Sequence, residues 1–172
     1  DRADIKTNII VNYGKATPAR TGGAIRDLLG IKASDNLINA SFVLVVEGDE
    51  DVIALKALLP TLSEKIGKAL KINMLVIEPI GGAGNLSYKL SSLKNSLCLT
   101  HTLLDGDDAG RLAFEKAQKD FLISVNTCTL INCHGWKNAE CEDCIATDIY
   151  KHDVSEHFGV DLSSSKFRGH NK

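Results

Sequence analysis

The most informative segment of this 172-residue chain reads Phe42-Val43-Leu44-Val45-Val46-Glu47-Gly48-Asp49-Glu50-Asp51. Its first half is a continuous apolar run rich in β-branched residues, which is typical of a strand buried on both faces of a parallel sheet. Its second half is acidic and follows the strand directly. We therefore expect a buried parallel strand that delivers carboxylates to one edge of a sheet.

Further strands and helices alternate along the rest of the chain. Apolar runs predict strands at 74–77 and 99–104 and within 121–131. Helical periodicity predicts two short helices over 51–59 and 62–70, or one helix kinked at Pro60. It also predicts helices over 85–94 and 108–119, and in two pieces between 138 and 158. This alternation predicts an α/β, Rossmann-like domain with a mainly parallel central sheet flanked by helices. Residues that act on a ligand are then expected just beyond the carboxyl ends of the strands.

Length and composition fit one globular domain. Apolar residues make up 44% of the chain and charged residues 24%, which argues against disordered and collagen-like classes. We expect a lead-in segment at 1–40, with a short helix at 24–29 closed by Gly30, a domain at 41–162 and a truncated tail at 163–172. The first residue is Asp1, so we expect a fragment of a longer protein. No apolar window is long enough for a membrane span, and no membrane partner is expected.

Carboxylates follow three of the predicted strands. Glu47 and Asp51 come after the first, and Asp105-Gly106-Asp107 comes after the third. A further acidic set, which contains Glu140 and Glu142, follows the fourth. Because the carboxyl ends of parallel strands share one edge of a sheet, these acids are expected to converge. Hard divalent cations such as Mg²⁺ and Mn²⁺ prefer carboxylate and water oxygens, so the sequence predicts a cation site there.

Some of these acids have a simpler explanation. Asp49, Glu50 and Asp108 stand where an acidic side chain favours the positive end of a helix dipole. Glu47 and Asp105 instead end apolar strands, where a partly desolvated carboxylate is costly unless it has a partner. Ten of the 22 acidic residues lie in the three sets, which leaves 12 acidic residues against 20 basic ones elsewhere. A near-neutral total therefore allows a basic surface around an acidic centre, as a phosphodiester substrate requires.

A strand that ends in Glu-Gly and a later strand that ends in Asp-x-Asp resemble the Toprim domain, over about residues 41–131. The motifs are Val45-Val46-Glu47-Gly48 and Leu103-Leu104-Asp105-Gly106-Asp107. Within that class the chain is similar to the OLD (overcoming lysogenisation defect) family of ATPase-linked nucleases, which includes the nuclease subunit of Gabija-type anti-phage systems. Three features carry this likeness: Asp51, the glycine-rich turn at 79–85, and the Glu-x-Glu-Asp stretch at 140–143, in which Cys141 takes the usual apolar place.

The resemblance implies DNA cleavage with two Mg²⁺ or Mn²⁺ ions. One ion would be held by Glu47 and Asp51 with help from Glu140 and Glu142, and the other by Asp105 and Asp107. A late catalytic lysine is also implied, for which the candidates are Lys166, which we favour, and Lys172. The chain has no P-loop motif, so ATP control would come from an ATPase region of the parent protein. That region could also form a homo-oligomer. DNA is the expected partner, and a bacterial cytoplasm the expected location.

Alternatives to a nuclease remain open. Five cysteines without an export signal indicate a reducing compartment, and Cys141 and Cys144 alone have zinc-knuckle spacing, so no zinc is expected. Helical i, i+3 packing would explain this pair. The glycines at 81–84 lack a full dinucleotide fingerprint and predict a tight turn. A phosphoacceptor receiver domain would need a lysine at the end of its last strand, and none follows Ile131 directly. The runner-up is a non-catalytic Toprim-type module that binds DNA or a partner.

Overall fold

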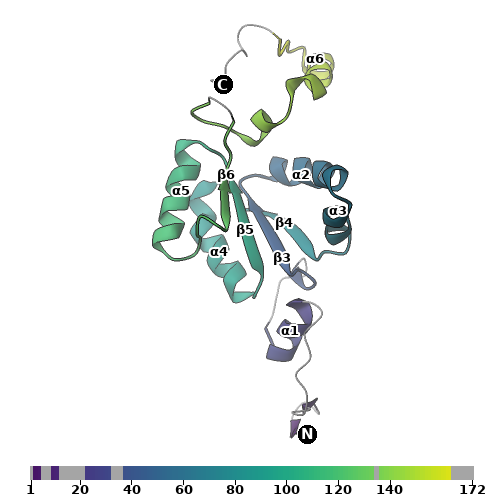
Figure 1. The fold of residues 1–172 in the computed structure, drawn as a ribbon, viewed down its shortest axis with the longest axis vertical. Helices are drawn as coiled ribbons and strands as arrows, with labels where there is room; N and C mark the ends of the chain where they lie inside the picture. Colours follow the sequence, from purple (N-terminus) through teal and green to yellow (C-terminus); the bar gives the residue numbers. More distant parts are fainter. Residues whose placement is uncertain (1, 5–8, 12–21, 32–36, 134–135, 164–172) are drawn as a thin grey trace.

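Four parallel strands form the central sheet of the computed structural model, in the order β4-β3-β5-β6 (Figure 1). They are β3 (Phe42–Val46), β4 (Leu75–Pro79), β5 (Leu99–Leu104) and β6 (Cys128–Leu130). The register pairs Phe42 with both Leu75 and Leu99, so the first strand of the sheet lies between its two neighbours. The predicted α/β class with a mainly parallel sheet is confirmed.

The structure describes residues 2–4, 9–11, 22–31, 37–133 and 136–163. The connecting helices are α2 (Asp49–Leu62), α3 (Glu64–Lys71), α4 (Leu86–Asn95) and α5 (Asp108–Lys119). Helix α1 (Gly22–Leu29) precedes the sheet and α6 (Lys151–Phe158) follows it. Short 3₁₀ turns are η2 (Ala83–Asn85), η3 (Cys141–Cys144) and η4 (Thr147–Ile149), and a small antiparallel hairpin joins β1 (Arg2–Asp4) to β2 (Ile9–Val11).

The hydrophobic core lies between the sheet and helices α4 and α5. Val43, Val45 and Leu104 point to this face and are buried against leucines of α4 and alanines of α5. Helices α2 and α3 lie on the other side of the sheet, next to β3 and β4 (Figure 1). Burial of these apolar side chains supplies the main stabilisation, at ~25 cal/mol per Å² of apolar surface removed from water. The sheet is thereby fixed, and with it the carboxyl ends of its strands.

The strand predicted within 121–131 is present but short. It covers only Cys128–Leu130, because Phe121 has a φ of 55° and a turn joins Thr127 to Ser124. Two other segments depart from the sequence prediction. The first part of the 138–158 segment forms two 3₁₀ turns, and only α6 is an α-helix. Helix α2 also continues through Pro60, and the break comes at Ser63, whose hydroxyl oxygen accepts from Ile66 N and caps α3.

Buried Arg26 fastens α1 to the amino-terminal end of the sheet, a feature that the sequence did not reveal. One of its terminal nitrogens donates to the carbonyl oxygens of Leu37, Ile38 and Ala40, each at 2.8 Å. The other donates to Ser96 O at 3.2 Å. Hydrogen bonds to a charged donor are worth about 1.5–3 kcal/mol each. The arginine therefore connects the segment before β3 to the turn after α4. Every helix in the described residues is too short or too polar to traverse a bilayer.

Candidate functional site

A cavity of about 500 Å³ opens at the carboxyl ends of the strands, between the loops that follow β3, β4, β5 and β6. Carboxylates from three separate parts of the chain line it. The complete lining consists of Glu47, Gly48, Asp49, Glu50, Asp51, Gly81, Gly82, Asp105, Glu140 and Glu142. Five of the six predicted metal ligands are in this set, so the sheet brings together acids that are far apart in sequence.

Glu47 is held directly against the end of the neighbouring strand. Its Oε1 accepts a hydrogen bond from Asp105 N at 2.9 Å. Its own carbonyl oxygen accepts from Gly81 N at 3.1 Å and Gly82 N at 3.2 Å, which folds the glycine turn toward the cavity. Both glycines have positive φ, at 66° and 102°, where a side chain would introduce strain. The tight turn predicted at 81–84 is present, and it forms one wall of the cavity.

The two strand-end acids resist ionisation. The pKa of Asp105 is raised to about 7, first by burial and then by the negative charges of Glu47, Asp51, Glu142 and Asp107. The pKa of Glu47 is also raised by burial and by Asp107 and Asp51, and the hydrogen bond from Asp105 opposes the shift. Crowded carboxylates in a partly desolvated site repel one another. A cation in the cavity would relieve that repulsion.

Asp51 and Asp107 also serve as helix caps. Asp51 Oδ2 accepts from Gly48 N at 3.0 Å at the start of α2. Asp107 Oδ1 accepts from Gly110 N at 2.7 Å at the start of α5. Asp51 lines the cavity, whereas Asp107 does not, although its charge acts on both Glu47 and Asp105. Asp107 therefore has the structural role at a helix N-terminus that an acidic residue in this position favours, and its role as a ligand stays a prediction.

Arg111 connects the loop after β5 to the segment that carries Glu140. Its guanidinium donates to Gly106 O and, at 3.2 Å, to Asn138 Oδ1, and it pairs with Asp108 at 2.9 Å. Gly106 N donates to Ala139 O at 2.7 Å, so the same two segments are also joined through their backbones. These contacts hold Glu140 and Glu142 over the strand ends. Arg111 belongs to no sequence motif. Its position one turn into α5 is the one sequence feature that points to this role.

Arg111→Lys is expected to weaken Mn²⁺ binding about 10-fold, because lysine cannot make the forked contacts to both loops, and loss of groups that support metal ligands typically costs 10–100-fold. The melting temperature should change little, since the arginine is partly exposed. Titration calorimetry with Mn²⁺ measures the effect, with Lys116→Arg on the same helix as control. Equal affinity in the arginine variant and the unaltered protein would contradict this role.

Gly106→Ala is expected to destabilise the fold by about 1–3 kcal/mol or more, the usual cost of overpacking. A Cβ atom at residue 106 would lie 2.0 Å from the carbonyl oxygen of Ile131, which is backbone and has little room to move. Gly84→Ala is the matched control, because a Cβ there meets no atom within 4 Å. Urea denaturation of the two variants measures the difference. Equal midpoints would show that the loop after β5 tolerates the added atom.

Two other groups complete the comparison with the sequence predictions. Lys166 and Lys172 lie outside the described residues. Cys144, predicted to pack with Cys141 along a helix, has its sulfur 3.7 Å from that of Cys133 instead, in a 3₁₀ turn.

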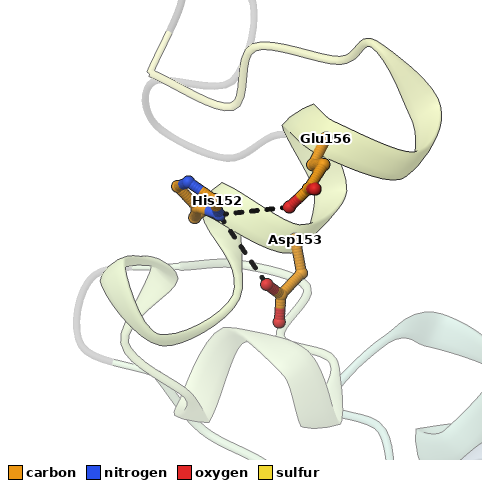
Figure 2. Close-up of side chains that lie close together, drawn as sticks. All are labelled: His152, Asp153 and Glu156. Carbon is orange, nitrogen blue, oxygen red and sulfur yellow. Dashed lines mark ion pairs between the residues drawn. The ribbon is translucent and has the colours of Figure 1, made fainter.

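A second cluster lies on α6 (Figure 2). His152, Asp153 and Glu156 have ligand atoms within 4.8 Å of one another, the one such trio among the described His, Cys, Asp and Glu residues. The ring nitrogen of His152 is 3.8 Å from Asp153 and 3.7 Å from Glu156. All three side chains are 66–84% exposed, so they belong to a solvent-exposed face of the helix. Among the described residues, no three ligand atoms of the cavity acids lie this close together.

Comparisons of the chain with protein-family models, with curated proteins and with solved structures find no match. The geometry of the cavity therefore carries the functional argument by itself.

Proposed function

We propose that the chain is a divalent-metal-dependent DNA endonuclease or nickase domain of the Toprim type, which hydrolyses phosphodiester bonds with two Mg²⁺ or Mn²⁺ ions. One observation carries the proposal: Glu47, Asp51, Asp105, Glu140 and Glu142 line a single cavity at the carboxyl ends of parallel strands. Ligand sites in open α/β sheets are found at this edge.

The donor set of the cavity fits hard cations. Among the described residues, every polar side chain in its lining is a carboxylate. Oxygen-only donors suit Mg²⁺ and Mn²⁺ over Zn²⁺ or copper. Burial, followed by the repulsion of neighbouring carboxylates, raises the pKa of Asp105 and Glu47. That repulsion supplies a driving force for cation binding, because a bound positive charge favours the ionised forms. A cavity of about 500 Å³ has room for cations with water and a phosphate group.

Each group of residues has a distinct task in this proposal. Glu47 and Asp105 form the fixed part of the site, because a hydrogen bond and two strand ends position them. Asp51, Glu140 and Glu142 add carboxylates from α2 and from the segment after β6. Bound cations would supply charge neutralisation at the attacking and leaving oxygens of the phosphodiester. The side chains orient that charge, which is the main source of rate enhancement in phosphoryl transfer.

The same proposal covers the family of the domain, its regulation, its biological role and its location. Its OLD-family character, the control by an ATPase region elsewhere in the parent protein, the role in anti-phage defence and the bacterial cytoplasm rest on the sequence motifs described above. The order of the motifs along strands and loops supports them. Glu-Gly follows β3, Asp-x-Asp follows β5, and the Glu-x-Glu stretch reaches the same cavity.

Conversion of supercoiled plasmid to open-circular and linear forms tests the proposal. We expect conversion with Mg²⁺ or Mn²⁺ and none with EDTA, with Ca²⁺ as a comparison ion that binds oxygen ligands. A chain that binds Mn²⁺ and retards DNA in a gel, yet leaves the plasmid intact with every ion, would support the non-catalytic binding module. A chain that binds no divalent ion would overturn the metal-dependent nuclease.

A further inference from the structure

We propose that Cys133 and Cys144 form an oxidation site. A reversible disulfide between them would join the two ends of the segment that places Glu140 and Glu142 at the cavity. Their sulfur atoms lie 3.7 Å apart, although eleven residues separate them in the chain. One cysteine stands just after β6, and the other ends the η3 turn. A disulfide here would therefore join the two ends of the segment that provides the third set of acids.

The position of this pair distinguishes it from the other cysteines. Cys144 is exposed and Cys133 is half-buried, so an oxidant in solution reaches the site. Cys98 lies instead against the Arg26 guanidinium, and Cys141 lies against Asp51. A disulfide requires sulfurs about 2.05 Å apart, so a further approach of less than about 2 Å is sufficient. The 3₁₀ turn and the chain after β6 need to shift by no more than that.

The chemistry balances with a peroxide as oxidant. Hydrogen peroxide oxidises the exposed Cys144 thiol to a sulfenic acid and releases one water. The sulfur of Cys133 then attacks the sulfenic sulfur, an S–S bond forms, and the hydroxyl leaves with the Cys133 proton as a second water. The two thiols lose two electrons and two protons, and the peroxide gains them. A thiol reductant such as glutathione reverses the reaction by exchange.

The disulfide is expected to lower the activity of the site, a consequence that rests on the proposed function. Glu142 is two residues before Cys144, so movement of Cys144 toward Cys133 pulls that carboxylate with it. In the reduced form Arg111 and the Gly106–Ala139 hydrogen bond set the position of the same segment. Displacement of metal ligands from their supports costs about 10–100-fold in metal affinity. We expect at least a 10-fold weaker Mn²⁺ affinity after oxidation.

Peptide mapping tests the disulfide independently of activity. The chain is treated with a small excess of hydrogen peroxide, alkylated and cleaved with trypsin. Tryptic peptides 120–137 and 138–151 each contain two cysteines, Cys128 with Cys133 and Cys141 with Cys144. Variants therefore assign the link: Cys133→Ser or Cys144→Ser should abolish the cross-linked mass, and Cys128→Ser or Cys141→Ser should keep it. A link that depends on another pair, or a Cys144 sulfinic acid without any link, would overturn the proposal.

Mn²⁺ calorimetry and plasmid nicking then test the consequence. The oxidised chain should bind Mn²⁺ at least 10-fold more weakly and nick more slowly than the reduced chain, and dithiothreitol should restore both. Cys144→Ser should behave the same with and without peroxide. Equal Mn²⁺ affinity in the oxidised and reduced chains would overturn the regulatory role even if the disulfide maps correctly. If neither form nicks DNA, the proposed function fails, and the mapping and the Mn²⁺ affinities still decide this inference.

Discussion

Glu47→Gln is expected to lower Mn²⁺-dependent nicking of supercoiled plasmid by at least about 100-fold. The substitution removes one negative charge from the centre of the cavity and preserves the side-chain oxygen that accepts from Asp105 N. Loss of a single preorganised electrostatic contact typically costs 10²–10³ in rate, and a metal ligand is at the upper end of that range. The initial rate of open-circle formation under saturating Mn²⁺ measures the effect.

The matched control for this experiment is Glu115→Gln. Glu115 is an exposed acid on α5 and is absent from the cavity lining, so the same chemical change there should leave nicking within about 2-fold of the unaltered chain. Circular dichroism and melting temperature should show that both variants are folded. Nicking by Glu47→Gln at the rate of the control would remove the cavity from the mechanism and leave the proposed function without support.

Asp105→Asn is expected to stabilise the metal-free protein at pH 8. In the folded chain the Asp105 carboxyl has a pKa of about 7, whereas an unfolded aspartate has a pKa near 4. Between these values the folded state binds more protons than the unfolded state, so the free energy of unfolding falls as the pH rises through that window. Below about pH 4 both states hold the proton, and above about pH 7 the loss is complete. Asparagine carries no charge, so the Asp105→Asn variant avoids this loss of stability.

For Asp105→Asn, the expected gain in the free energy of unfolding is about 1–2 kcal/mol at pH 8. This is less than the full pKa shift of Asp105 implies, because the carboxyl is partly open to solvent and screened. For a chain of this size, that corresponds to a rise in Tm of roughly 2–8 °C. Thermal denaturation with EDTA from pH 4 to pH 8.5 measures it. The unaltered chain should lose stability across this range, and the variant should lose less.

Addition of Mn²⁺ should reverse the order of the two melting temperatures, so that the unaltered chain melts above Asp105→Asn. A ligand that binds only the folded state stabilises it by an amount that grows with the logarithm of the ratio of ligand concentration to Kd, so Mn²⁺ should stabilise the unaltered chain more than Asp105→Asn. Glu115→Gln again serves as control and should follow the unaltered chain at every pH. A lower melting temperature for Asp105→Asn at pH 8 with EDTA would show that the carboxylate is not a source of strain in the folded state.

Local patterns in the sequence were sufficient for most of the elements. Phe42–Val46 and Leu99–Leu104 are strands as expected, and the helix predicted over 108–119 is α5 with the same bounds. These segments have a strong hydrophobic pattern and clear terminal residues, such as Asp107 at the N-cap of α5. The segment after β6 lacks a helical period. Its η3 turn begins with a local capping box, in which Asp143 Oδ2 accepts from Glu140 N, whereas contacts of Ala139 with Gly106 and of Asn138 with Arg111 join the segment to parts that are distant in the sequence.

The α/β class, the parallel sheet, the acids that follow β3, β5 and β6 and the acids at helix N-termini could all be predicted from local sequence, because strand burial, strand-end position and capping are local consequences of composition and period. Which of those acids share a cavity depends on the folded chain. The tertiary structure also decided that the sulfurs of Cys133 and Cys144 would be in contact. Distances between loops depend on how the sheet, the glycine turns and Arg111 position separate segments, and no local pattern encodes them.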